Sequence, residues 1–319
     1  MINRRQLRIK VLQALYAYFQ SDNKNIITAE KQVLSDIEKM YDLFIYQLSF
    51  LVEIIEFVKF RSEENKQKFF PTEEEINPNT KFIDNKFLKQ LSTNKSLIKH
   101  IELRKISWHE QNDLILKLYK KIKNSSFYIE YMNSDNNSYE ADKKIVIKLL
   151  KKIILPDDIL KSFYEEKNIN WVYDYEIVNF MIIKTIKSYK QSWDEYTSLP
   201  SLYKLTPEGN NEYVQMVKDL FKKSILRSKE FDELINEKAK NWDLDRIAII
   251  DVIIIKMALV EFLEFPYVPL KVSMNEYIEI SKIFSSPNSK SFINGMLDKL
   301  VADLKKNNKI KKIGRGLLE

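Results

Sequence analysis

Apolar side chains recur with helical spacing along most of the chain. In the first 20 residues they fall at intervals of three and four positions, which is the pattern of a helix with one buried face. These positions are Leu7, Val11, Ala14, Leu15 and Tyr18. Similar patterns predict helices over residues 29–61, 101–123 and 140–190. Residues 62–98 are more polar, and an exposed loop is expected at 69–80.

Composition also favours helices. The 319 residues include only four glycines and eight prolines, so the chain has few residues that favour turns. The apolar share of 45% is enough to build a core at this length. These features predict an all-α protein of one large or two ordinary domains. Residues 197–211 contain Pro200, Pro207 and Gly209, the clearest break in the pattern, and we place a domain boundary there.

A degenerate repeat lies on the two sides of this break. Residues 146–174 align without a gap on residues 217–245, and eleven of the 29 aligned residues are identical. Chance matching at this composition would give about two or three identities. We therefore interpret 146–186 as a degenerate copy of 217–257.

The second copy continues into a segment, 247–263, that is apolar on nearly all sides, as expected for a central helix. Asp251 interrupts this segment, and no cation stands three or four residues away from it. A buried aspartate here needs a partner from elsewhere in the fold or from a ligand.

The two helices that follow have recognisable starts. Ser273 and Glu276 have the spacing of a capping box, so a helix is expected to begin there. Ser286 can cap the next helix, with Pro287 in its first turn. Gly295 lies inside that helix, where it costs about 1 kcal/mol relative to alanine. Either this glycine lets the helix pack tightly against the bundle or approach a ligand, or it is tolerated near a loose helix end.

Positive charge points to a polyanionic partner, although a lysine-rich surface can also serve solubility alone. The net charge is +7 and the pI is near 9.0. Only eight residues are arginines, and Arg4, Arg5 and Arg8 are three of them. Guanidinium groups recognise phosphates and base edges through paired hydrogen bonds. Tyr16 follows Arg8 at two helical turns, so it either stacks on an unpaired base or packs in the core.

Other chemistry is disfavoured. The chain has no cysteine, and its two histidines, His100 and His109, would point to opposite sides of a helix, so we expect no metal site and no cofactor. The basic first residues are not followed by an apolar signal-peptide core, and no segment has the length of a membrane span. We expect a cytoplasmic protein that is not an enzyme.

Four motifs occur in a characteristic order. They are RRQLRIKVLQALY, WDLDRIAIIDVIIIKMALVEFL, VPLKVSMNEYIEISKIFS and SFINGMLDKL. Together they resemble the NusB family, the bacterial transcription antitermination factors. The resemblance implies a helical bundle that binds the boxA element of ribosomal RNA leader transcripts. It also implies a heterodimer with NusE, a small-subunit ribosomal protein, and assembly into an antitermination complex on RNA polymerase.

The resemblance also implies roles for individual residues. The residues expected to contact RNA are Arg4, Arg5, Arg8, Tyr16, Asn288, Lys290, Phe292 and Asn294. Tyr16 and Asp251 are expected at the interface with the partner protein.

The chain departs from the family in length. The family-like bundle is expected in residues 1–20 and 205–304, with a helical insertion at 21–204 and a basic tail at 305–319. Two other functions remain open: a helical interaction scaffold without specific RNA binding, and an accessory domain for rRNA modification. An RNA methyltransferase is disfavoured because the chain lacks both a glycine-rich cofactor loop and a cysteine nucleophile.

Overall fold

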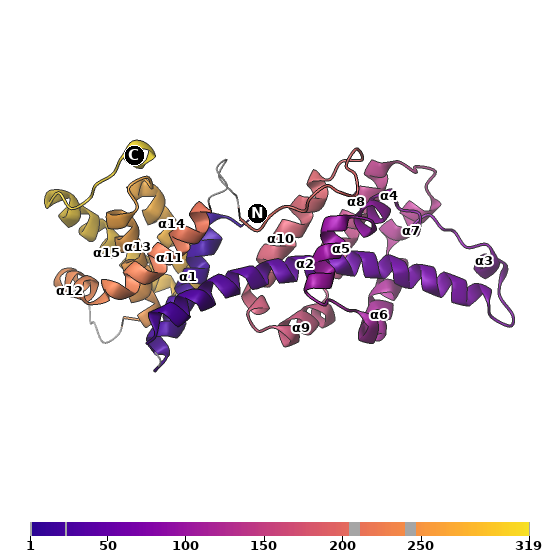
Figure 1. The fold of residues 1–319 in the computed structure, drawn as a ribbon, viewed down its shortest axis with the longest axis horizontal. Coiled ribbons are helices and arrows are strands. Elements are labelled where there is room, and N and C mark those ends of the chain that lie inside the picture. The colour runs from indigo at the N-terminus through magenta and orange to yellow at the C-terminus, as the bar shows by residue number, and fades with distance from the viewer. Residues whose placement is uncertain (1, 23, 204–210, 240–246, 319) are drawn as a thin grey trace. The chain divides into compact units, whose positions relative to one another are not determined.

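The computed structural model describes residues 2–22, 24–203, 211–239 and 247–318, apart from the side chains of residues 287 and 288 (Figure 1). Every regular element in these ranges is a helix, and they contain no β-strand. The predicted all-α class is confirmed.

The chain divides into two compact units, and α2 (Ile26–Lys66) contributes to both. The middle unit comprises residues 38–202, and the terminal unit comprises residues 2–37 together with 203–319. Each unit has its own core and is described by itself.

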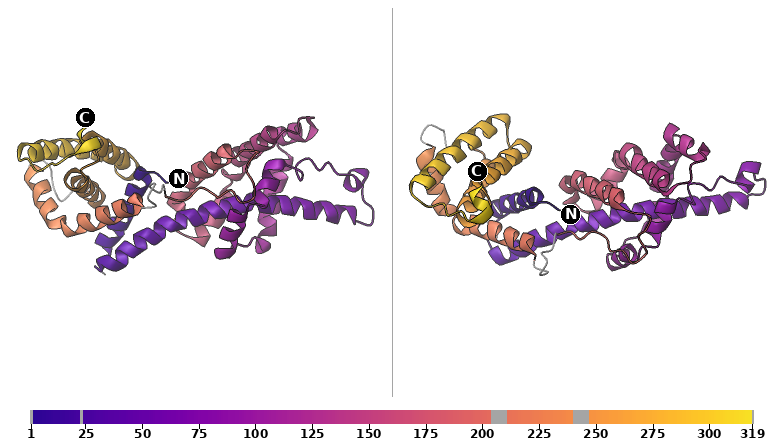
Figure 2. Two further views of the ribbon diagram at one scale, coloured as in Figure 1. Left: turned by 45° about the horizontal axis from the view of Figure 1, so that its top comes forward. Right: turned by 90° about the horizontal axis from the view of Figure 1, so that it is seen from above.

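The terminal unit is a bundle around one central helix, α13 (Ile249–Glu264). Its other helices are α1 (Arg4–Gln20), the first turns of α2, α11 (Glu212–Leu226), α12 (Ser228–Lys238), α14 (Leu270–Phe284), α15 (Pro287–Lys306) and the short η4 (Gly314–Leu317). α1, α11, α12, α14 and α15 all pack on α13 (Figure 2). These five neighbouring helices explain why α13 is apolar on nearly all sides, because they leave almost none of its surface exposed to solvent.

Helix α1 begins with a capping box, in which the Asn3 side chain accepts from the Gln6 backbone and Gln6 reaches back to Asn3. Its predicted apolar face is buried at Leu7, Val11 and Leu15. α1 runs antiparallel to α13, because its start reaches the end of α13 through the Arg8 to Glu261 contact. Its end places Phe19 against Lys256, nearer the start of α13.

The start of α14 differs from the predicted one. The helix begins at Leu270, three residues before Ser273, so the predicted capping box does not exist. Ser273 and Glu276 lie inside the helix and hold side chains of other helices instead. The start of α15 is as predicted, because the Ser286 side chain caps the helix and Pro287 occupies its first turn.

The middle unit contains the rest of α2 and a series of shorter helices. These are α3 (Glu73–Ile76), α4 (Lys86–Ser92), α5 (Lys95–Leu103), η1 (His109–Gln111), α6 (Asn112–Lys123), α7 (Ser126–Asn133), α8 (Tyr139–Leu149), the π-helical η2 (Leu150–Ile154), α9 (Asp158–Lys167) and α10 (Trp171–Ser188). The description of residues 62–98 as a polar segment is wrong for their second half. α4 and α5 lie there, and Phe87 and Leu91 are fully buried.

Corresponding helices occupy the two copies of the predicted repeat. α8 with η2, α9 and α10 follow one another in the middle unit as α11, α12 and α13 do in the terminal unit. The aligned residues 240–246 lie outside the described ranges. No described helix combines the length and the apolar character that a membrane crossing requires.

Gly295 has more room than the sequence suggested. A Cβ built on it meets no described atom within 4 Å apart from the nearby backbone of its own helix, so the expectation that this glycine permits tight packing against the bundle is wrong. Gly316 is the opposite case, because a Cβ there would lie 1.9 Å from the carbonyl oxygen of Pro266.

We therefore expect Gly295→Ala to raise the free energy of unfolding by about 0.5 to 1 kcal/mol, because alanine loses less backbone entropy in a helix and no atom obstructs its methyl group. Gly316→Ala should lower it. Chemical denaturation of both variants beside the wild type measures the two effects, and a destabilised Gly295→Ala protein would contradict the open space seen here.

Candidate nucleic-acid interface

A buried ion pair joins α1 to α13. The Arg8 Nε lies 2.5 Å from Glu261 Oε1, and Arg8 Nη2 lies 2.9 Å from Oε2. Two neutral groups of α14 donate further hydrogen bonds to this carboxylate, the Ser273 hydroxyl at 2.7 Å and the Tyr277 hydroxyl at 2.8 Å. The side chains of Arg8 and Glu261 are 2% and 0% exposed. Both oxygens of this carboxylate are satisfied, as a buried charge requires.

The electrostatics of the cluster keep Arg8 charged and Tyr277 neutral. Burial alone lowers the pKa of Arg8, but the charge and hydrogen bonds of Glu261 outweigh it and raise the pKa. Burial also raises the pKa of Tyr277 well above its ordinary value. Arg8 is therefore a permanent internal cation. In this structure its guanidinium is buried against Glu261, and its predicted contact with RNA stays a prediction.

Arg5 lies one turn earlier on α1 and is partly exposed. Its Nε and Nη2 each donate to Glu276 at 2.8 Å, and Nη1 of Arg8 lies 3.6 Å from the same carboxylate. The hydrogen bond from Arg5 and the charges of both arginines lower the pKa of Glu276. The Arg5 side chain is 42% exposed, so it remains accessible while Glu276 fixes its plane.

Arg4 is the most exposed of the three. Its Nη2 lies 3.6 Å from Glu212 on α11, and its guanidinium lies 5.9 Å from the centre of the Tyr213 ring. An ion pair between two such exposed side chains contributes little to stability, so Arg4 can exchange this partner for another anion.

A cavity of about 500 Å³ collects these groups. Four of the eight arginines of the chain line it: Arg4, Arg5, Arg8 and Arg315. Glu276 lies on its wall, and Tyr267 comes from the turn between α13 and α14. The sequence analysis did not single out Arg315. The scarcity of arginine was the signal available for it, since most other cations of the tail are lysines.

The Tyr16 side chain is exposed, so it does not pack in the core, and its stacking on an unpaired base stays a prediction. In the row Arg8, Leu12 and Tyr16, the first two residues are buried and only the tyrosine reaches solvent. Tyr16 lies three turns beyond Arg5, or about 16 Å along the helix.

The start of α15 adds another cation to this side of the bundle. Lys290 is exposed in the first turns of the helix. Glu279 of α14 lies within electrostatic range of both segments: its hydrogen bond from Lys282 lowers its pKa, and the charges of Arg5 and Lys290 act in the same direction. The structure thus brings both Lys290 and Arg5 within electrostatic range of one residue of α14, Glu279.

The remaining predicted residues differ in their accessibility. Phe292 is buried, so its ring belongs to the core, and its predicted contact with RNA stays a prediction. Asn294 is exposed and its Nδ2 lies 3.4 Å from Asp298. Asn288 lies in the first turn of α15, but its side chain is outside the described part.

Asp251 lies in the first turn of α13 and is 3% exposed. Its Oδ1 has no hydrogen-bond partner among the described residues. The described residues also contain no group of three acidic or histidine side chains that could hold a metal ion.

We expect Arg8→Met to reduce the free energy of unfolding by about 3 to 5 kcal/mol, because Glu261 would stay buried without its cation. The matched change at the exposed position, Arg4→Met, should cost less than about 1 kcal/mol. Equal stability of the two variants in chemical denaturation would contradict the structural role of Arg8.

The lowered pKa of Glu276 makes stability depend on pH in one direction. The Arg5 to Glu276 contact contributes in full above the ordinary glutamate pKa of 4.5 and disappears as pH falls through the lower folded value. Between about pH 5 and about pH 3, the wild type should therefore lose more stability than Glu276→Gln. Unfolding curves collected across this range measure the difference, and parallel pH profiles would contradict it.

Comparison of the sequence with known proteins identifies its family. The sequence model described as the NusB family matches residues 176–302, so the match begins within α10 and does not include α1. The transcription antitermination protein NusB of Salinibacter ruber is 36% identical over 138 residues, which cover 43% of this chain and 86% of that protein.

Two further relatives carry the same name. The protein of Koribacter versatilis is 44% identical over 86 residues, and that of Chloroherpeton thalassium is 42% identical over 90 residues. These alignments cover 27% and 28% of this chain, and 59% and 43% of the two relatives. No solved structure matches the chain. The extent of the Salinibacter alignment, with four ordered motifs and a helical bundle, shows that the chain belongs to the NusB family.

Proposed function

We propose that this protein is a transcription antitermination factor that binds boxA-type RNA of ribosomal RNA leader transcripts together with NusE. Its curated relatives are named as transcription antitermination proteins. One structural observation carries the RNA part of the proposal: the exposed guanidinium groups of Arg4 and Arg5 line one cavity of the family-like unit.

This arrangement suits single-stranded RNA. Guanidinium groups contact phosphates, while an exposed aromatic ring on the same helix can stack on an unpaired base. We assign the phosphates to Arg4 and Arg5 and the stacking role to Tyr16. Arg5 keeps its Nη1 for a phosphate oxygen, because its Nε and Nη2 are used by Glu276.

The start of α15 forms the second part of the proposed surface. Lys290, Asn288 and Asn294 are assigned to further RNA contacts, with Lys290 and Asn294 supported by their exposure. Arg8 and Phe292 act from the interior, where they hold α1 and α15 in position.

Protein partners are assigned to other positions. Tyr16 and Asp251 are proposed at the NusE interface, supported for Asp251 by a carboxylate oxygen without a described hydrogen-bond partner. The assembly would then join the antitermination complex on RNA polymerase. Residues 1–20 and 205–304 are proposed as the RNA-binding bundle, and 21–204 as a helical insertion that extends it.

A helical scaffold without specific RNA binding is the second candidate. It is favoured by the fact that each arginine of the first helix already faces a carboxylate: Glu212, Glu276 or Glu261. The two functions differ in their response to salt, because only RNA binding releases counterions from phosphates.

The test is a titration of the full chain, with and without NusE, against a boxA leader RNA and a scrambled RNA at several salt concentrations. The wild type should prefer boxA. In the double variant that carries both Arg4→Gln and Arg5→Gln, the slope of log affinity against log salt concentration should flatten by about 0.7 for each phosphate that the variant no longer binds.

Arg61→Gln is the matched control, since Arg61 is an exposed, ion-paired arginine of the middle unit. It should bind as the wild type does. Equal affinity for the two RNAs, or an unchanged slope in the double variant, would favour the scaffold.

A further inference from the structure

The C-terminal tail folds back onto the end of α13. Lys312 Nζ donates to the carbonyl oxygens of Glu261 and Phe265, both at 2.9 Å, and the Ile313 amide donates to the Pro266 carbonyl at 3.1 Å. Carbonyl groups at a helix end lack partners within the helix, so these contacts satisfy groups that would otherwise need water. The tail is a docked part of the bundle.

Two glycines make this close fit possible. Gly314 has a φ of 51°, a conformation that side chains other than glycine rarely adopt, and it lies beside the Tyr267 ring. Gly316 lies so close to Pro266 that even a methyl group would collide with its carbonyl oxygen. The residue between them, Arg315, is therefore held at a defined place.

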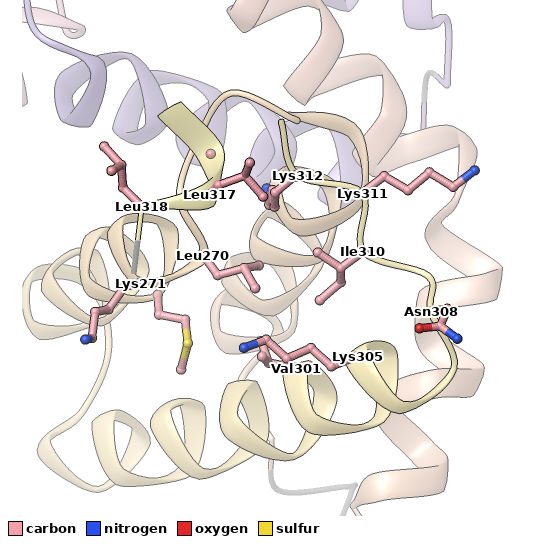
Figure 3. A pocket seen from close by; sticks show the side chains of 12 residues that line it. Leu270, Lys271, Val301, Lys305, Asn308, Ile310, Lys311, Lys312, Leu317 and Leu318 are labelled. Carbon is pink, nitrogen blue, oxygen red and sulfur yellow. The ribbon is translucent and has the colours of Figure 1, made fainter. Parts of the chain in front are cut away.

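The tail separates two cavities. Leu317 and Gly316 line a cavity of about 720 Å³ between α14 and α15, together with Leu270 and Ile310 (Figure 3). Arg315 lines the other cavity, the one that holds the four arginines. Tail residues on the two sides of Arg315 thus anchor the backbone, while Arg315 itself lines the same cavity as the arginines of the first helix.

Charge is not balanced in the arginine cavity. Arg4, Arg5 and Arg8 each face a carboxylate. Arg315 is exposed, and its side chain makes no ion pair or hydrogen bond with a described residue. The fourth guanidinium therefore supplies the excess positive charge, and it comes from a segment that is distant from the first helix in sequence.

We propose that Arg315 is an RNA-binding residue: the docked tail presents it beside Arg4 and Arg5 to bind a phosphate of single-stranded RNA. The inference rests on the proposed function for the identity of the ligand. Phosphate is the favoured anion because guanidinium groups from two segments can approach its oxygens from different directions. The exposed Tyr16 on the neighbouring helix favours a nucleic acid over an acidic protein.

The experiment uses the full chain and compares Arg315→Gln with Lys311→Gln. Lys311 is a matched control, because it is an exposed cation of the same tail that lines the other cavity. Affinity is measured for boxA leader RNA and for a scrambled RNA of equal length over a range of salt. Arg315→Gln should weaken binding of both RNAs by about fivefold at 0.1 M salt and flatten the slope by about 0.7, whereas Lys311→Gln should change neither.

A second variant tests position rather than charge. Gly316→Ala keeps Arg315 but displaces its backbone, so it should reproduce the weaker binding. If Arg315→Gln binds both RNAs with an unchanged slope, the inference is overturned. If it instead weakens only the complex with NusE, the cavity serves an acidic protein surface and the inference is also overturned.

The design separates this inference from the proposed function. A wild type that does not distinguish boxA from scrambled RNA contradicts the proposed function, yet the slope of Arg315→Gln on either RNA still tests the phosphate contact. A wild type that binds neither RNA contradicts both.

Discussion

The terminal unit depends on one buried ion pair, Arg8 with Glu261. A guanidinium and a carboxylate that are buried away from solvent need hydrogen-bond partners for their polar atoms. Ser273 and Tyr277 supply two of these partners by donating to Glu261. The backbone carbonyl of the same glutamate accepts from Lys312. One residue of α13 thereby joins the first helix, α14 and the C-terminal tail, which are far apart in sequence.

This constraint divides the arginines of α1 by function. Because Arg8 points into the core, the helix is fixed in rotation about its axis, and Arg4 and Arg5 must lie at the rim of the cavity. Glu276 contacts both Arg5 and Arg8, so the internal pair and the exposed one are physically coupled. Preordered guanidinium groups lose less entropy on binding an anion than free ones, which is a reason to retain ion pairs at a binding surface.

The sequence predicts the features that depend on local pattern. Periodicity identified the buried face of α1, the continuous apolar run identified α13 as a central helix, and the residues Ser286 and Pro287 identified the capped start of α15. It could not place Arg8, because its partner lies 253 residues away and a residue flanking the apolar stripe can turn either inward or outward. The same limit explains Ser273, whose capping spacing is real but whose hydroxyl serves a distant carboxylate. Arg315 was missed because its role depends on where the tail docks.

The repeat suggests why the long insertion is compatible with the bundle. α8 to α10 and α11 to α13 share an order of helices. Glu261 lies beyond the predicted repeat, which ends at residue 257, so the carboxylate that holds Arg8 is not part of the repeated segment. The predicted copy can therefore reproduce the order of the helices without reproducing the arginine cavity, because every residue that lines this cavity lies outside the repeated segment.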